Sequence, residues 1–219
     1  MPAREVKPIG VFGGMFDPIH IGHLRPALEI LEELDLECVR FVPCARPPHR
    51  ADPDHSVELR ARLVAAAISD QPGFELDERE MRRAGPSYTV DTLGEMRAEL
   101  GEERPLCLLL GMDAFLGLPR WHRWETLFEL AHVVVMQRPG SRFAPDQQLA
   151  PVLAARRVAE PERIAAAPAG CIYVQTVTQL EVSSTDIRAR LAQGRSVRYL
   201  MPEAEWDLLR EAGGYRDPE

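Results

Sequence analysis

Residues 9–23 of the chain read IGVFGGMFDPIHIGH, and the change of pattern within this stretch decides the fold. The apolar run at 9–12 predicts a buried strand that ends in a tight turn at Gly13 and Gly14. From Gly22 onward, leucines recur at helical spacing until Leu34, with glutamates on the other faces. A second apolar run at 39–42 ends at Pro43. The order of strand, glycine turn, helix and strand predicts a βαβ unit and therefore a parallel sheet.

The remaining chain continues this alternation. Apolar runs predict strands at 106–110, 132–136 and 172–177, and helical spacing predicts helices near 59–67, 90–100, 185–193 and 203–211. The segment 44–55 holds three prolines and predicts a loop, while 138–170 gives no clear pattern. We expect an α/β fold: a Rossmann-like, doubly wound parallel sheet with helices on both faces and a small C-terminal helical part. We expect a single domain over 1–219, with the Rossmann-like core at about 6–180 and the helical part at about 181–219.

Composition narrows the function classes. The chain has 219 residues, 45% of them hydrophobic and 27% charged, with a net charge of −8, which is typical of a globular protein but not of one that coats nucleic acid or anionic membrane. No apolar run approaches the ~18 residues of a membrane span, and the N-terminus lacks the pattern of a signal peptide. The four cysteines share no C-x-x-C spacing and favour reduced thiols over a disulfide or zinc framework. We therefore expect a cytoplasmic protein with no nucleic-acid or membrane partner.

The turn after the first strand has the properties of a phosphate site. Glycines allow a ligand to approach the backbone closely, and the N-terminus of the next helix attracts anions. His20 and His23 lie on one side of the first turn of that helix and can donate hydrogen bonds to phosphate oxygens. The stretch is neither a Walker A loop nor a G-x-G-x-x-G fingerprint. Two alternatives stay open from the residues alone: a metal site at the histidines, which lacks further ligands, and two capping or surface histidines.

A second stretch, VSSTDIR at 182–188, has related chemistry. Its hydroxyl side chains can cap the helix that follows. Arg188 lies in the first turn of that helix and can hold a phosphate through two parallel hydrogen bonds. Taken alone, the stretch fits a capped helix with a solvated arginine equally well.

Together, the two stretches resemble the two signatures of the adenylyltransferase superfamily, G-x-F-D-P-x-H-x-G-H and I-S-S-T-x-I-R. The resemblance implies transfer of an AMP unit from ATP to a phosphate, with Mg²⁺ as cofactor. The string HIGH is also similar to class I aminoacyl-tRNA synthetases, but this chain has no K-M-S-K-S loop. Met15 stands where the family usually has Thr or Ser, and Asp17 is interpreted as a turn residue with Pro18. The implied catalytic residues are His20, His23 and Arg188. The implied ATP-binding residues are Gly13, Gly14, Met15, Phe16, Gly22, Gly111, Asp113, Ser183, Ser184 and Thr185.

Three further segments, PSYTVDTL at 86–93, GMDAF at 111–115 and LPRWHRWE at 118–125, together with the loop RPPHR at 46–50, resemble the bacterial nicotinate-nucleotide adenylyltransferase family. The resemblance covers nearly the whole chain and is weakest over 140–170. The nicotinate ring needs an aromatic platform, which Trp121 can supply, and its carboxylate can bind N–H groups at the helix that opens at Tyr88 and Thr89. Core packing remains the alternative for Trp121 and Tyr88, and a solvated surface is the alternative for the basic residues. The implied nicotinate mononucleotide-binding residues are Tyr88, Thr89, Trp121, His122, Arg46, His49, Arg50 and Arg138.

The expected reaction is adenylyl transfer from ATP to the 5′-phosphate of nicotinate mononucleotide, giving nicotinate adenine dinucleotide and pyrophosphate in NAD biosynthesis. The nucleophile is already an anion, so no general base is needed, and Mg²⁺ would be held mainly by phosphates rather than by a protein metal site. ATP and nicotinate mononucleotide are the expected partners. The alternatives are transfer to nicotinamide mononucleotide or another phosphate such as phosphopantetheine, and a non-catalytic nucleotide-binding module. The sequence gives no oligomeric state.

Overall fold

The fold is built on a sheet of parallel strands. A computed structural model describes residues 6–48, 53–137, 143–178 and 180–212. Within these ranges, seven strands pair in the order β3-β2-β1-β4-β5-β7-β6, and every pairing is parallel. The strands are β1 (Ile9–Gly14), β2 (Cys38–Pro43), β3 (Phe74–Leu76), β4 (Leu106–Gly111), β5 (His132–Gln137), β6 (Arg157–Val158) and β7 (Ile172–Thr176).

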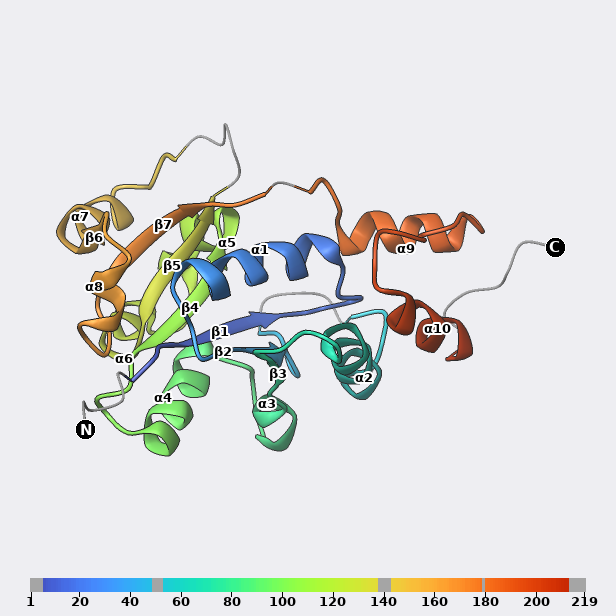
Figure 1. The fold of residues 1–219 in the computed structure, drawn as a ribbon, viewed down its shortest axis with the longest axis horizontal. Helices are drawn as coiled ribbons and strands as arrows, with labels where there is room; N and C mark the ends of the chain where they lie inside the picture. Colours follow the sequence, from blue (N-terminus) through green and yellow to red (C-terminus); the bar gives the residue numbers. More distant parts are fainter. Residues whose placement is uncertain (1–5, 49–52, 138–142, 179, 213–219) are drawn as a thin grey trace.

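Helices cover both faces of the sheet, with α1 on one side and α3 and α4 on the other (Figure 1). Their bounds are α1 (Ile21–Glu33), α2 (Val57–Ile68), α3 (Arg79–Arg82), α4 (Thr89–Leu100), α5 (Met112–Leu116), α6 (Leu127–Leu130), α7 (Leu149–Arg156), α8 (Glu162–Ala165), α9 (Ser184–Ala192) and α10 (Glu203–Glu211). Two 3₁₀ turns, Leu118–Arg120 and Trp124–Thr126, follow α5. This confirms the expected doubly wound architecture.

The central strands β1, β4 and β5 are mostly apolar because they are buried on both faces. In β4, Leu106, Leu108 and Leu110 belong to the hydrophobic cluster that includes α4, whereas Cys107 and Leu109 belong to the cluster that includes α1. The side chains of a strand alternate between faces, so a continuous apolar run is what a sheet covered on both sides requires. The same alternation leaves the polar residues for the carboxyl ends of the strands.

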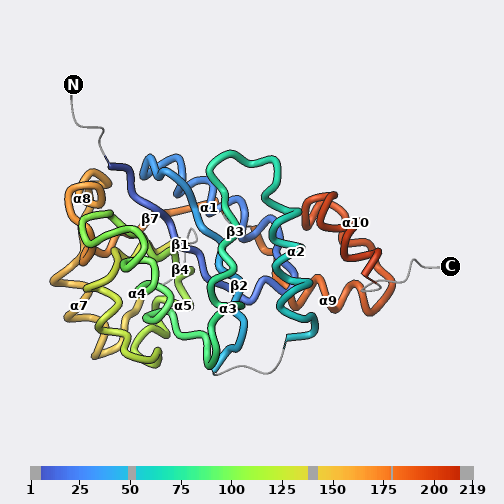
Figure 2. The backbone as a smooth tube through the Cα atoms, turned by 90° about the horizontal axis from the view of Figure 1, so that it is seen from below, coloured from blue at the N-terminus to red at the C-terminus, as the bar shows by residue number. Residues whose placement is uncertain are grey.

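The C-terminal helices α9 and α10 lie beyond the carboxyl ends of the strands and pack on α2. A third hydrophobic cluster joins Leu63 of α2 to Ile187 and Leu191 of α9 and to Leu209 of α10. Figures 1 and 2 show α2, α9 and α10 grouped at one end of the molecule. The last helices are therefore attached where parallel α/β sheets bind ligands.

Most of the predicted elements are present within a few residues of their expected bounds. Ser56, for example, caps α2 by accepting a hydrogen bond from the Leu59 N–H at 3.3 Å. The sequence pattern did not indicate the short strands β3 and β6 at the two sheet edges, nor α7 and α8 within 138–170. None of the four cysteines forms a disulfide. None of the helices in the described ranges has the length and apolarity that a membrane span requires.

Candidate active site

The turn between β1 and α1 forms the floor of the site. Gly14 is required there because a Cβ on it would lie 2.8 Å from the Phe16 ring. Phe16 has a φ of 47°, in the left-handed region that non-glycine residues rarely adopt. Its buried ring contacts the rings of Phe12, Phe41 and His23. The core therefore holds Phe16 in place and leaves its backbone at the cavity.

His20 and His23 lie side by side at the N-terminus of α1, as their spacing predicts. His20 is the N-cap residue, and the two ring centroids are 3.8 Å apart. In the described structure, Nδ1 of each ring is buried and has no hydrogen-bond partner. A Cβ on Gly22 would lie 3.0 Å from the His20 ring, so Gly22 makes room for it. Each histidine therefore has a ring nitrogen near this helix N-terminus that makes no hydrogen bond within the described structure.

Burial controls the charge of these histidines. It lowers the pKa of His20 to about 4. Burial, together with repulsion from His20, lowers the pKa of His23 well below its usual value. Both rings are therefore neutral near pH 7 in the free protein. A neutral imidazole still donates one hydrogen bond, and a phosphate beside it would raise its pKa.

The opposite wall comes from the C-terminal part of the chain. Ser183 caps α9 by accepting a hydrogen bond from the Asp186 N–H at 3.0 Å, as predicted. The Ser184 hydroxyl donates to the Pro18 carbonyl at 2.9 Å. The Ile21 N–H at the start of α1 donates to the Leu200 carbonyl at 3.1 Å. Segments more than 160 residues apart in sequence are thereby fastened together around one opening.

Arg188 has protein partners in this structure. Its Nη1 donates to the Asp17 carbonyl at 2.7 Å, and its Nε forms an ion pair with Asp54. The Arg188 side chain is 30% exposed and lines the larger cavity described below. The Asp54 pair occupies donors that a phosphate would use, so a phosphate there has to replace this carboxylate.

Asp17 is held inside the turn. Its carboxylate accepts hydrogen bonds from His55 Nδ1 at 2.6 Å and from the Asp54 N–H at 2.8 Å. Burial favours the neutral acid, but these hydrogen bonds and the neighbouring positive groups outweigh it and lower the pKa of Asp17. The side chain is buried with its oxygens engaged, which supports a turn-stabilising role for it.

The two walls enclose a cavity of about 650 Å³, which we call the larger cavity. Its far end is formed by residues at and beyond the end of β7, which the sequence pattern did not indicate: Val177, Thr178, Leu180 and Val182. Asp113 lies exposed on α5 and is not among the described residues that line it. All the other predicted catalytic and ATP-binding residues line it: Gly13, Gly14, Met15, Phe16, His20, Gly22, His23, Gly111, Ser183, Ser184, Thr185 and Arg188.

A second opening of about 310 Å³, the smaller cavity, lies on the other side of the turn. Tyr88, Thr89, Trp121 and His122 line it, as predicted. Tyr88 is the N-cap residue of α4, and its ring lies 4.3 Å from the His122 ring, tilted by 31°. The helix N-terminus and the aromatic rings are therefore in one cavity.

Arg46, the predicted basic residue of this group that the structure describes, is not placed with these rings. The Arg46 guanidinium donates to the Arg83 carbonyl at 2.7 Å, and Arg46 is not among the described residues that line either cavity. Ser87 fixes this loop, since its hydroxyl accepts hydrogen bonds from the N–H groups of Ala45 and Arg46. His49, Arg50 and Arg138 lie outside the described residues.

Arg60 of α2 stabilises the backbone beside both cavities, and it was not among the predicted site residues. Its side chain is fully buried, and its guanidinium donates to the carbonyls of Met15, Cys44 and His55 at 2.6, 2.8 and 3.2 Å. Burial lowers its pKa from the ordinary value, although an arginine remains charged. The signal was available: Arg60 falls on the apolar stripe of α2, three residues before Leu63.

The two cavities share a wall. Phe12, Gly13, Gly14, Met15 and Gly111 line both of them. A ligand in each cavity would therefore meet the other at the glycine turn, beside the two histidines. Within the described ranges, no three His, Cys, Asp or Glu side chains come together in a way that could hold a metal ion.

Comparison with known sequences gives consistent results. Residues 11–190 match the cytidylyltransferase-like family. A protein of Halorhodospira halophila, named as a probable nicotinate-nucleotide adenylyltransferase, is 54% identical over 216 residues, which cover 99% of each chain. A protein of Methylococcus capsulatus with the same name is 50% identical and covers 94% of this chain and 99% of its own.

Comparison with solved structures gives the same fold. Nicotinic acid mononucleotide adenylyltransferase of Plasmodium falciparum, complexed with NaAD, superposes with a TM-score of 0.70 at 17% identity. The superposition covers 94% of this chain and 96% of that one. A putative nicotinate-nucleotide adenylyltransferase from Vibrio parahaemolyticus gives a TM-score of 0.62 at 18% identity, over 93% of this chain and 99% of that one.

Proposed function

Because the chain belongs to the cytidylyltransferase-like family and, within it, to the nicotinate-nucleotide adenylyltransferases, we propose that it transfers the AMP unit of ATP to nicotinate mononucleotide. The 5′-phosphate of the mononucleotide attacks the α-phosphorus of ATP, and the bond from that phosphorus to the bridging oxygen breaks. The products are nicotinate adenine dinucleotide and pyrophosphate, and the step belongs to NAD biosynthesis.

The shared wall of the two cavities is the observation that carries this proposal. ATP in the larger cavity and the mononucleotide in the smaller one would place their phosphates together along Gly13, Gly14 and Met15. Such an arrangement turns a reaction between two anions into one between aligned neighbours, and alignment is a main part of the barrier. The protein needs no nucleophile of its own because the substrate phosphate is already an anion.

We assign the electrostatic work to three side chains. The unfilled donors of His20 and His23 would bind phosphate oxygens of ATP, with the N-termini of α1 and α9 supporting them. Arg188 would exchange its ion pair with Asp54 for the pyrophosphate that leaves. His20 and His23 are fixed by packing before the substrate arrives, so they need little reorganisation during the reaction.

The mononucleotide would lie with its ring against Trp121 and its carboxylate at the start of α4. No side chain caps α4 in the described structure, so the N–H groups after Tyr88 can bind an anion. A neutral carboxamide would gain less there, which favours the acid over the amide. His49, Arg50 and Arg138 remain proposed phosphate contacts, Arg46 a weaker one because its guanidinium already binds the Arg83 carbonyl, and Asp113 a proposed ribose contact.

Mg²⁺ fits this site as a companion of ATP. With no cluster of three metal-ligating side chains in the described ranges, the ion would be held mainly by the phosphate oxygens. It would neutralise part of the charge on the triphosphate when bound.

The test is pyrophosphate release with ATP and Mg²⁺, with nicotinate mononucleotide, nicotinamide mononucleotide and phosphopantetheine as separate acceptors. We expect rapid release with nicotinate mononucleotide and much slower release with the others. Release only with another acceptor would keep the chemistry and overturn the roles of Tyr88, Thr89 and Trp121. A protein that releases pyrophosphate with none of them would be a nucleotide-binding module.

A further inference from the structure

The smaller cavity contains a buried carboxylate that the proposed chemistry does not use. Glu80 of α3 lines this cavity, and its side chain is only 8% exposed. Its Oε1 accepts a hydrogen bond from the Thr92 hydroxyl at 2.7 Å. In the described structure, its Oε2 is buried and has no hydrogen-bond partner. A buried carboxylate oxygen without a partner is costly, so it calls for an explanation.

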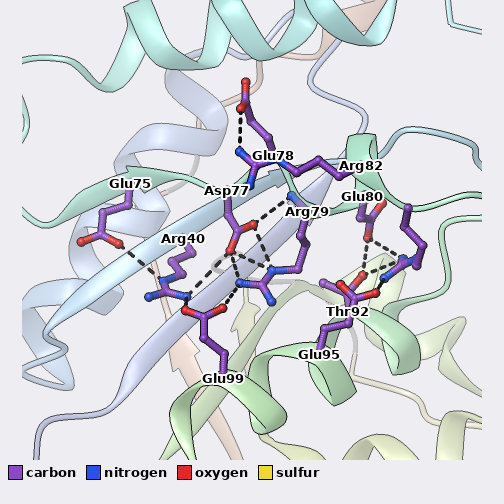
Figure 3. Close-up of polar contacts among 11 residues, drawn as sticks. Arg40, Glu75, Asp77, Glu78, Arg79, Glu80, Arg82, Thr92, Glu95 and Glu99 are labelled. Carbon is purple, nitrogen blue, oxygen red and sulfur yellow. Dashed lines mark hydrogen bonds and ion pairs between the residues drawn. The ribbon is translucent and has the colours of Figure 1, made fainter.

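The charges around Glu80 do not balance. Arg83 lies 3.9 Å from Glu80 Oε1, but its Nη1 binds Glu95 at 2.9 Å and its Nη2 donates to Thr92 at 3.0 Å. One cation therefore serves two carboxylates, and the group keeps a net negative charge. Figure 3 shows Glu80, Thr92 and Glu95 beside the two arginines of α3, which have acidic partners of their own: Arg79 binds Asp77 and Glu99, and Arg82 binds Glu78.

The other walls of the cavity suit a flat, positively charged ring. Tyr88, Trp121 and His122 provide aromatic surface in the same opening. In a pyridine mononucleotide the sugar is attached to the ring nitrogen, so the ring carries a positive charge. A negative charge in a cavity wall that holds little water attracts a positively charged ring more strongly than the same charge would in bulk water. The same charge repels the phosphate, which would turn that end of the ligand towards the glycine turn.

We propose that Glu80 is a specificity-determining residue that recognises the positive charge of the pyridinium ring and so selects the oxidised mononucleotide over its reduced, uncharged form. This inference rests on the proposed function, since it takes nicotinate mononucleotide as the occupant of the smaller cavity. Thr92 and Arg83 hold the carboxylate in position, and the ring supplies the interaction that Oε2 lacks in the free protein.

The test compares binding of nicotinate mononucleotide with binding of its 1,4-dihydro derivative by calorimetry, since reduction removes the charge of the ring together with its aromaticity. We expect the wild-type protein to bind the cationic form about tenfold more tightly. Glu80→Gln keeps the shape and the hydrogen bond from Thr92 but removes the charge, so the ratio should fall to the smaller preference that the difference in stacking alone gives.

Glu95→Gln is the matched control. It also removes a carboxylate from Arg83, but Glu95 is 40% exposed at its side chain and is not among the residues that line the cavity. We expect the ratio to fall less than in Glu80→Gln, because this variant leaves Arg83 to Glu80 but keeps the carboxylate in the cavity wall. A purely structural network would instead weaken both ligands equally in both variants.

Three results would overturn the inference. One is equal binding of the two forms by the wild-type protein, which needs no variant to fold. Another is a Glu80→Gln protein that keeps the wild-type ratio. The third is tighter binding of nicotinate mononucleotide by Glu80→Gln, which would place the carboxylate against the acid group of the substrate. Failure of the wild-type protein to bind or use nicotinate mononucleotide at all would instead overturn the proposed function, and the inference with it.

Discussion

The walls of the two cavities consist of different chemical groups. The larger cavity is built from a backbone turn, two helix N-termini and two neutral histidines, which come from both ends of the chain. The smaller cavity is built from side chains of the middle of the chain: aromatic rings and a buried carboxylate. Both open at the carboxyl edge of the same sheet and share the glycine turn.

This difference separates two ways of binding a nucleotide. Backbone N–H groups and neutral donors bind phosphate whatever the base attached to it, so under the proposed function the larger cavity would supply the chemistry. Ring stacking and a fixed charge distinguish one ring from another, so the smaller cavity would supply the selection. We therefore expect variants on the two sides to affect different kinetic constants.

The largest effect should follow loss of a histidine. We expect His20→Ala or His23→Ala to lower kcat by about 10²–10³, the usual cost of one oxyanion-stabilising donor, with little change in the KM for nicotinate mononucleotide. Steady-state kinetics with each substrate varied will measure this. His122→Ala, on the other cavity, should act on that KM instead. Near-normal kcat in either histidine variant would remove that residue from the mechanism.

Acidification should destabilise the larger cavity. His20 has a pKa of about 4 when folded and an ordinary value of 6.5, so between these values the unfolded chain binds a proton that the folded chain does not. Above about pH 6.5 this difference in pKa does not lower the free energy of unfolding. As the pH falls from 6.5 to 4, it lowers the free energy of unfolding by about 3 kcal/mol. Urea unfolding across this range should show a shallower pH dependence for His20→Asn. Equal slopes would contradict the depressed pKa.

Variants of the two neighbouring tryptophans should distinguish a residue that binds the substrate from one that stabilises the fold. Trp121→Ala should raise the KM for nicotinate mononucleotide about tenfold or more, with little effect on ATP, because a stacked ring contributes roughly 1–3 kcal/mol. Trp124 packs edge-on against Phe128, with the ring centroids 6.2 Å apart, and it does not line the smaller cavity. Trp124→Ala should lower the melting temperature and keep that KM. Equal changes in both substrate constants for Trp121→Ala would count against stacking.

The smallest effect concerns the loop that carries Arg46. We expect Arg46→Ala to change the KM for the mononucleotide less than about threefold, since its guanidinium binds the Arg83 carbonyl at the surface. Ser87→Ala should cost more, because the Ser87 hydroxyl accepts two N–H groups of this loop. A large increase in the KM for the mononucleotide in Arg46→Ala, together with no change in Ser87→Ala, would identify Arg46 as a strong phosphate contact.

The same contrast explains what the sequence could predict. The fold and the larger cavity depend on backbone geometry, and glycines, capping serines and apolar runs report that geometry directly. Ser183, Gly14 and the His20–His23 pair are where the pattern predicts them because a turn and a helix start leave few choices. The edge strands β3 and β6 have three and two residues, too short for a periodic signal.

The smaller cavity was harder to predict because the charge of a long side chain does not indicate which group that side chain contacts in the folded protein. Arg46 was assigned to phosphate from its charge and its neighbours, but it reaches a carbonyl on another segment. Glu80 was not indicated at all, since EREMRR at 78–83 has the composition of a solvated helix. Its burial depends on Thr92 and Arg83, which only the folded chain brings to it.

The fastening of α1 to the C-terminal part also matters during synthesis. The glycine turn leaves the ribosome long before the Leu200 carbonyl that binds the Ile21 N–H, and before the α9 wall. At ordinary translation rates the two walls are separated by roughly 10–35 seconds. A nascent chain can therefore form most of its sheet while its larger cavity still lacks a side, and tight binding of a ligand there would be confined to chains that have grown past α9.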